Sequence, residues 1–458
     1  MIAETAPLPR VFRGRTHVAA IRDAHDPRAL AAGAHPQWPY RIAGRLMARR
    51  DHGRSCFMDV DDRTGTLQVH MRLDPAGEQR LSRLAVGDVV GVDGCVYVTR
   101  RGELALELDD CVVLAKARRP PPRRSRTARF AEREADLIAG ERSREVLITR
   151  ARVIAAIREW MNARGFVELE TPVLQRVFGG ASARPFVTHH HALDRRLCLR
   201  ISTELYLKRG IVGGLEDVYD LGKCFRNEGI SARHSPEFTM LEWFQTCADY
   251  TDVCTLVETM VSDVALRVLG TTRIERGGTT IELAPPWRRL TVREGILEVT
   301  GVDVADRDAP ALAQLVGRWA QPGDDWPQLV ELAHSKLVEP TLIQPTFVLD
   351  FPVSLFPLAR RHPHDADLAE AFDAVVGGIE MSSGSTDVND AAEQRSRFLE
   401  QAQRSGDGGD EPHPLDEGFL RALEYGMLPL GGAGMGIDRL VMLLTGCESL
   451  RDVIAFPT

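Results

Sequence analysis

The sequence contains no long hydrophobic run. Of its 458 residues, 44% are hydrophobic and 27% are charged, yet no stretch approaches the roughly 20 apolar residues that span a bilayer. The first residues, MIAETAPLPRVFRGR, also lack the apolar core of a secretion signal. These absences exclude a membrane-spanning class of protein, and we expect the chain to work in the cytoplasm.

Paired cysteines and a strong positive charge are missing as well. The eight cysteines are scattered without a CxxC motif, which excludes a zinc ribbon and a disulfide framework. The chain has 57 Lys and Arg against 65 Asp and Glu, for a net charge of −8. Such a surface disfavours non-specific binding of polyanions. A nucleic acid would therefore have to bind a local basic patch.

The chain divides by composition into four segments. Residues 1–39 form a short extension, and residues 40–116 hold five short alternating runs that predict a small all-β barrel. Residues 117–140 are rich in Arg and Pro, and three consecutive prolines predict either a stiff cationic linker or a solvated hinge. Residues 141–458 mix helical and β-rich runs. We expect them to form an α+β domain on an antiparallel sheet.

Two long helices are predicted in this last segment. Residues 151–162 place apolar side chains at helical spacing, and Gly165 follows them. A second run of the same kind covers residues 251–269 and stops at Gly270.

The segment FRNEGISARHSPEFTMLEW carries the first candidate site. Arg226 and Glu228 stand two residues apart, so on a strand they would share one face. The polar loop that follows contains Arg233 and His234. Guanidinium groups on a rigid sheet can each bind two phosphate oxygens, and Phe238 could cover a base. This segment predicts a site for a nucleoside triphosphate.

The segment GGAGMGIDRLVMLLTG is a second candidate. Its glycine-rich run leads into a predicted helix that carries Arg439. No βαβ unit follows the run, so it is not the fingerprint of a dinucleotide-binding fold. Taken alone, the glycines are explained equally well by close packing of a strand against a helix.

Taken together, the two segments resemble blocks of the class II aminoacyl-tRNA synthetases, and within them of the lysyl-tRNA synthetases. The resemblance runs from about residue 40 to the end. RISTELYLKR, DFPVSLFPLARR and RDVIAFP are similar to lysyl-type blocks in order and spacing. ETP at 170–172 is similar to the dimer-forming motif of the family, which implies a homodimer. The barrel would correspond to the anticodon-binding OB-fold, and the rest to the class II catalytic domain.

The resemblance implies an ATP site and a magnesium site. Arg226 would hold the α-phosphate and the amino acid carboxylate, and Arg439 would reach the γ-phosphate, so both would act in catalysis. Asp373 and Glu380 look like the Mg²⁺-binding carboxylates, with Asp where the family usually has Glu. The other implied ATP-binding residues are Glu228, Arg233, His234, Phe238 and Glu380.

The implied amino acid pocket departs from the family pattern. Its residues would be Gly180, Glu204, Arg226, Glu242, Phe244, Ser383, Ser385 and Asp387. Phe244 stands where a tyrosine is expected, and the last three residues replace an asparagine, a phenylalanine and a glutamate. The substitutions predict a wider and wetter pocket. A buried carboxylate pair at Glu204 and Asp387 still predicts a cationic side chain between them. Drift in a duplicated copy would explain the same changes.

The resemblance also implies RNA-binding residues in the barrel. Phe57 would stack on an anticodon base, with Gln68 and Glu103 as possible readers of base edges. A phenylalanine in the barrel core is the alternative for Phe57. The three histidines at 189–191 invite a metal hypothesis, but similar blocks of the family carry a His pair without metal.

Three functions follow from these residues. The first is activation of lysine with ATP as a substrate and Mg²⁺ as a cofactor, release of pyrophosphate, and transfer of lysine to the 3′ end of tRNA. The second is a paralogue that activates a lysine analogue or transfers lysine to a protein, a lipid precursor or a small molecule. The third is a non-catalytic RNA-binding or regulatory protein. The complete phosphate and metal set argues against the third.

Overall fold

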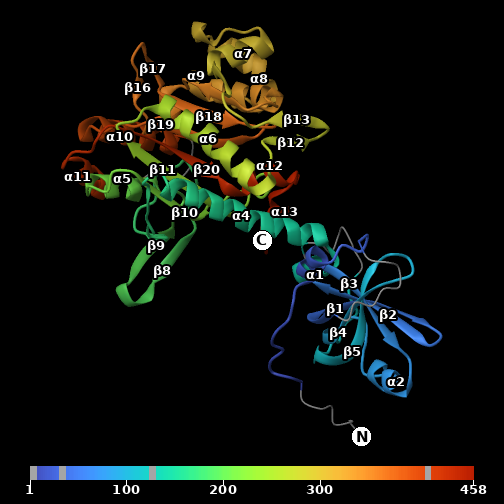
Figure 1. Cartoon of the computed structure of the whole chain (residues 1–458). Coiled ribbons are helices and arrows are strands. Elements are labelled where there is room, and N and C mark those ends of the chain that lie inside the picture. Colours follow the sequence, from blue (N-terminus) through green and yellow to red (C-terminus); the bar gives the residue numbers. More distant parts are fainter. Residues whose placement is uncertain (1–7, 30–37, 123–129, 131, 408–413, 458) are drawn as a thin grey trace. The chain divides into compact units, whose positions relative to one another are not determined.

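The structure, a computed structural model, describes residues 8–29, 38–122, 130, 132–407 and 414–457. The chain forms two compact units, whose boundary lies between Arg144 and Glu145. Figure 1 shows the elements of each unit. In the part of the chain that the structure describes, no helix has both the length and the apolar character needed to cross a membrane.

The first unit contains the predicted barrel. Its five strands close in the order β1-β2-β3-β5-β4, and all neighbours are antiparallel except β3 and β5. In β2, buried Cys56, Met58 and Val60 alternate with partly exposed residues, so one face of the strand supplies the core. The elements are α1 (Val18–Ala24), β1 (Trp38–His52), β2 (Ser55–Asp62), β3 (Gly65–Arg72), α2 (Pro75–Leu81), β4 (Val89–Val98) and β5 (Leu104–Ala115).

The predicted linker at 117–140 contains a short helix, α3 (Arg133–Ala139). The helix begins well after the three prolines, which lack the backbone N–H that a helix interior needs. Gly140 separates it from the long helix α4 (Glu141–Asn162). Residues 123–129 and 131 of this segment lie outside the described residues.

The second unit is built on an eight-stranded sheet that is mostly antiparallel, which confirms the predicted α+β domain. The strand order is β14-β15-β18-β19-β20-β11-β10-β6, and only the two outermost pairs are parallel. The strands are β6 (Val167–Glu168), β10 (Val218–Phe225), β11 (Glu237–Thr246), β14 (Arg288–Thr291), β15 (Thr346–Leu349), β18 (Ala371–Val375), β19 (Glu380–Thr386) and β20 (Leu430–Gly436). Three smaller sheets comprise β7 (Leu174–Gln175), β8 (Val187–His190) and β9 (Arg195–Leu199); β12 (Arg273–Arg276) and β13 (Thr279–Glu282); and β16 (Arg361–His362) and β17 (Asp365–Ala369).

Helices cover one face of the large sheet. Trp160 of α4 and Leu440 of α12 join Leu241 and Trp243 of β11 in one buried core. Helix α6 begins with a capping box. It ends at Gly270, as predicted. The remaining helices are α5 (Glu204–Val212), α6 (Tyr250–Leu269), α7 (Val292–Thr300), α8 (Ala309–Val316), α9 (Trp326–Ala333), α10 (Ala391–Asp407), α11 (Glu417–Leu423), α12 (Ile437–Thr445) and α13 (Leu450–Val453).

The opposite face of the sheet holds the candidate site. Side chains on a strand alternate between faces, so β11 directs Leu241 and Trp243 into the helical core. Between and beyond them, Glu242 and Phe244 line a cavity on the other side. The alternation in a single strand thus separates the core from the site.

Candidate active site

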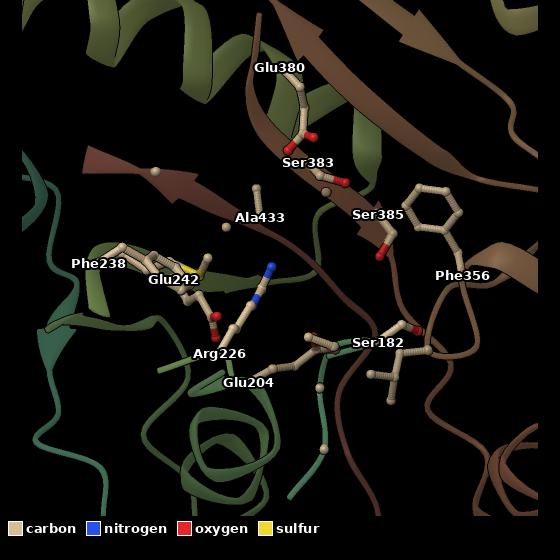
Figure 2. A pocket seen from close by; sticks show the side chains of 18 of the residues that line it. Ser182, Glu204, Arg226, Phe238, Glu242, Phe356, Glu380, Ser383, Ser385 and Ala433 are labelled. Atoms are coloured by element: carbon tan, nitrogen blue, oxygen red, sulfur yellow. The ribbon is translucent and has the colours of Figure 1, made fainter. Parts of the chain in front are cut away.

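A cavity of 510 Å³ brings together most of the predicted site residues. Figure 2 shows Arg226, Glu204 and Glu242 facing Glu380, Ser383 and Ser385 across it. Of the residues predicted for this domain, the cavity is lined by Gly180, Glu204, Arg226, Glu228, Arg233, His234, Phe238, Glu242, Phe244, Glu380, Ser383, Ser385 and Arg439. Asp373 and Asp387 are not among the residues that line it.

The glycine-rich run is a strand of the cavity floor, β20. At Gly432, a Cβ atom would lie 2.1 Å from Cδ1 of Phe244 on the neighbouring strand. Glycine at 432 therefore makes room for the Phe244 ring, which a Cβ atom would displace. The run leads directly into α12, whose first turn carries Arg439. The run also packs closely against a helix, since a Cβ atom at Gly431 would lie 2.9 Å from Cγ2 of Val253 on α6, and it brings Arg439 to the cavity lining.

Arg226 lies at the start of the loop that joins β10 to β11. Its backbone N–H donates to the carbonyl of Pro236 at 2.9 Å, which closes the loop. The guanidinium carbon lies 5.1 Å from the ring centroid of Phe238, within range of a cation–π contact. The buried Nε has no hydrogen-bond partner among the described residues. Arg226 thus presents an unsatisfied donor inside the cavity wall.

Two further arginines contact the chain just before and within β19. Arg439 Nη1 donates to the carbonyl of Glu380 at 2.6 Å and lies 3.3 Å from its carboxylate. Arg233 Nη1 donates to the carbonyl of Gly378 at 3.2 Å. Burial lowers the pKa of nearby His234, and the positive charge of Arg439 lowers it further. Three arginines therefore gather at this end of the cavity, where Arg233 Nη1 also lies 3.7 Å from a carboxylate oxygen of Glu339. Guanidinium groups are suitable partners for phosphate oxygens.

The two predicted metal ligands occupy neighbouring strands. Asp373 of β18 faces Ser383 of β19, and Glu380 begins β19. Burial raises the pKa of Asp373 well above its usual value, and the negative charge of Glu380 adds to the rise. A divalent cation would relieve both effects, so the donor set fits Mg²⁺.

The metal would need ligands from outside the protein. Among the residues that the structure describes, no group of three or more His, Cys, Asp or Glu is arranged to hold a metal ion. Mg²⁺ is commonly bound by one or two carboxylates together with phosphate oxygens and water. Asp373 and Glu380 match that mode of binding.

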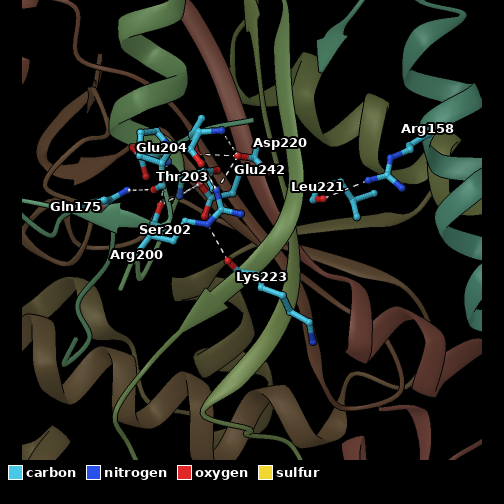
Figure 3. A network of polar contacts seen from close by, with 12 residues as sticks. Arg158, Gln175, Arg200, Ser202, Thr203, Glu204, Asp220, Leu221, Lys223 and Glu242 are labelled. Carbon is cyan, nitrogen blue, oxygen red and sulfur yellow. Dashed lines mark hydrogen bonds and ion pairs between the residues drawn. The ribbon is translucent and has the colours of Figure 1, made fainter. Parts of the chain in front are cut away.

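The residues predicted for the amino acid pocket lie at one end of the cavity, which we call the amino acid end. Glu242 is its most constrained carboxylate. Its Oε2 accepts hydrogen bonds from Ser202 Oγ, Thr203 N and Thr203 Oγ1 at 2.7–2.9 Å (Figure 3). Burial raises its pKa, and the neighbouring charge of Glu204 adds to the rise. Gly180 borders the same place with a φ of 81°, where a Cβ atom would lie 2.7 Å from Ser202 Oγ. A glycine at 180 keeps this corner open.

A lysine of the protein itself lies between the other two carboxylates. Lys208 is fully buried, and its Nζ lies 2.6 Å from Glu204 Oε1 and 3.1 Å from Asp387 Oδ2. Its Nζ is also 5.0 Å from the ring centroid of Phe244. Burial acts to lower the pKa of Lys208, but Asp387 and Glu204 outweigh it and raise the pKa. The cation between Glu204 and Asp387 is therefore an internal one.

Ser385 and Phe356 form the far wall of the amino acid end. Ser385 Oγ donates to Asp387 Oδ1 at 2.8 Å, so this hydroxyl turns toward the internal ion pair. Figure 2 shows Ser385 beside Phe356. The cavity lining continues from here to Phe398 and Gln401 of α10. The aromatic ring of this wall therefore comes from Phe356 and not from residue 385.

Sequence reasoning missed Lys208 and Phe356. Lys208 stands four residues after Glu204 on α5, and this spacing allows an ion pair on a helix. That spacing was the available signal. Its link to Asp387 depends on how α5 packs against the end of β19, which no local pattern records. Phe356 lies in an irregular segment without a periodic pattern.

The predicted RNA-binding residues lie on the barrel. Phe57 stacks on His70 with ring centroids 4.9 Å apart, and it is partly exposed between buried Cys56 and Met58. It therefore lies on the outer face and not in the barrel core. Gln68 is on the neighbouring strand β3, and exposed Glu103 precedes β5.

The three histidines at 189–191 lie at an exposed turn. His189 and His190 end β8, and the ring of His189 is 3.1 Å from a carboxylate oxygen of Asp194. They are remote from the cavity lining.

The chain is similar to proteins of known activity. Residues 125–458 match the family of class II tRNA synthetases (D, K and N), and residues 40–114 match the OB-fold nucleic acid binding domain. The lysine–tRNA ligase of Pelotomaculum thermopropionicum is 46% identical over 433 residues, which cover 92% of this chain and 86% of the relative. The lysine–tRNA ligase of Moorella thermoacetica is 47% identical over 429 residues, or 91% and 88% of the two chains.

Proposed function

The chain belongs to the lysine–tRNA ligase family of class II tRNA synthetases, and we propose that it activates lysine with ATP and transfers the lysyl group to the 3′ end of a tRNA. The activated intermediate would be a lysyl-adenylate, formed with release of pyrophosphate. Asp373 and Glu380 would hold Mg²⁺. That ion, when bound, would neutralise charge on the phosphates.

The position of Arg226 carries the proposal. Its guanidinium has a buried, unsatisfied Nε and projects between the carboxylates of Glu204 and Glu242 and the strand that carries Glu380 (Figure 2). A cation at this place can bind the carboxylate of an amino acid and the α-phosphate of ATP together. Phe238, against which Arg226 packs, offers its ring to the adenine.

The remaining roles follow from the charges. An amino acid carboxylate is ionised at neutral pH, so its attack on the α-phosphorus needs no protein base. Arg226 would orient the two reacting groups, and Arg439 and Arg233 would neutralise the leaving pyrophosphate. Glu204 and Glu242 would bind the ammonium groups of lysine. Catalysis would then consist of positioning and charge neutralisation.

The acceptor and the assembly belong to the same proposal. The outward ring of Phe57 suits stacking on an anticodon base, which favours tRNA over a protein, lipid or small-molecule acceptor. We expect a homodimer that works in the cytoplasm, and analytical ultracentrifugation would test the dimer.

The decisive experiment is ATP–pyrophosphate exchange with each of the 20 amino acids, followed by charging of total tRNA with the best of them. We expect exchange with lysine and Mg²⁺, and radioactive lysine in acid-precipitable tRNA. Exchange without charging would point to a different acceptor. The absence of exchange with every amino acid would contradict the proposal.

A second candidate is a larger lysine analogue as the preferred amino acid. The small side chain of Ser385 in the cavity wall favours it, together with the use of Asp387 by Lys208. A lysine substrate would share Glu204 with Lys208, so Glu242 would be the predicted carboxylate without an internal cation. Exchange assays with 5-hydroxylysine and Nε-methyl-lysine beside lysine would distinguish the two candidates by their kcat/KM values.

A further inference from the structure

His334 is a buried histidine behind the candidate metal site, outside the cavity lining. It directly follows α9 and begins a π-helical turn, His334–Val338. Such turns are rare in proteins, but those that occur are often found at functional sites. The residue is only 2% exposed. Its Nε2 lies 3.8 Å from Oδ2 of Asp373, which is too long for a hydrogen bond of about 2.7–3.2 Å.

Both ring nitrogens of His334 lack a hydrogen-bond partner among the described residues. A buried polar group without a partner destabilises the fold, and an apolar residue of the same shape would avoid this cost. The ring also packs edge-on against Phe351, with centroids 5.1 Å apart. A phenylalanine could make that packing contact equally well. Packing therefore explains the ring but not its nitrogens.

Asp373 is the carboxylate that lies beside these nitrogens, with its Oδ2 3.8 Å from Nε2. It does not line the cavity, and its side chain is shorter than that of a glutamate by one methylene. A small movement of either side chain would bring Oδ2 within hydrogen-bond distance of the His334 ring. Metal-binding groups are commonly oriented by such a hydrogen bond from behind.

We propose that His334 is a positioning residue for the metal site, which donates a ring N–H to Asp373 when a divalent cation binds that carboxylate and Glu380. The inference rests on the proposed function, because it assumes that Asp373 and Glu380 bind the metal that accompanies ATP. It adds a residue from the α9 segment to a site otherwise made from β18 and β19. His334 itself does not contact the metal.

The test measures metal binding and not turnover. Mn²⁺ serves as the probe, because its free concentration can be followed by electron paramagnetic resonance in the presence of α,β-methylene ATP. His334→Phe should weaken Mn²⁺ binding by about 10- to 100-fold. His334→Gln, which keeps an N–H donor, should recover most of that loss. A purely structural role would change thermal unfolding without this pattern in metal affinity.

Two control variants separate the possible failures. Phe351→Leu removes the ring against which His334 packs but no nitrogen, and it should bind Mn²⁺ as the wild type does. Asp373→Asn should abolish tight binding. Wild-type affinity in His334→Phe, with weak binding in Asp373→Asn, would overturn the inference and leave the metal site standing. Wild-type affinity in Asp373→Asn would overturn both the inference about His334 and the assignment of the metal site. His334→Leu provides the same comparison if His334→Phe does not fold.

Discussion

The two ends of the cavity differ in how their charges are held. At the phosphate end, Arg233 and Arg439 donate to main-chain carbonyls of Gly378 and Glu380. Both arginines also have a carboxylate nearby, since Arg439 Nη1 lies 3.3 Å from Glu380 and Arg233 Nη1 lies 3.7 Å from Glu339, but these ion pairs are partly exposed. The two cations can therefore move to a phosphate, which is a stronger acceptor than a carbonyl. At the amino acid end, Lys208 neutralises two carboxylates inside the fold. The comparison teaches that the cations at the phosphate end sit in partly exposed pairs that a ligand can open, whereas the cation at the other end is fully buried between two carboxylates.

Removal of the internal cation should have the largest effect. Lys208→Met would leave Glu204 and Asp387 as buried charges without a partner, and loss of one member of a buried ion pair costs about 3–5 kcal/mol. The free energy of unfolding, measured by urea titration, should fall by that amount. The double variant Lys208→Met with Asp387→Asn should recover at least half of the loss. A fall below about 1 kcal/mol in the single variant would mean that Lys208 does not balance this end.

Variants at the phosphate end should instead affect the reaction and not the fold. Arg226→Ala or Arg439→Ala should reduce ATP–pyrophosphate exchange by at least about a hundredfold, because each removes a charge-assisted contact to the triphosphate. Their urea midpoints should stay near that of the wild type. Wild-type exchange rates in either variant would contradict the assignment of this end.

A combined change at the amino acid end tests whether the residues of its wall set the choice of substrate. Phe244→Tyr, Ser383→Asn, Ser385→Phe and Asp387→Glu together should raise kcat/KM for lysine on the order of tenfold. They should lower it for 5-hydroxylysine. The mechanism is a closer wall and a carboxylate that extends one methylene further. Unchanged values for both amino acids would show that this wall does not select the side chain.

The smallest effect on exchange is expected from the barrel, which belongs to neither end of the cavity. Phe57→Ala should weaken tRNA binding by about 1–3 kcal/mol through loss of a stacked base. It should leave ATP–pyrophosphate exchange unchanged. Filter binding at fixed salt would measure the first quantity, with Glu237→Ala as a control on the surface of the other unit. Equal tRNA affinity for Phe57→Ala and the wild type would remove Phe57 from the RNA surface.

Local patterns predicted the phosphate end well. Arg226 and Phe238 flank one short loop, so a single stretch of sequence contains both. The barrel was equally readable, because its strands alternate buried and exposed residues with a period of two. The helix α3 was not predicted, since the prolines that precede it exclude a helix only at their own positions.

The sequence by itself determined the class of the fold, the five-stranded barrel and the cationic loop that lines one end of the cavity, because these depend on periodicity and on neighbours along the chain. Only the tertiary structure decided that Lys208 meets Asp387 and that His334 lies behind Asp373. Each of these pairs joins a helical segment to a strand that is distant in sequence. Whether two such groups meet depends on how the helix packs on the sheet and excludes water, and that packing is a property of the whole core.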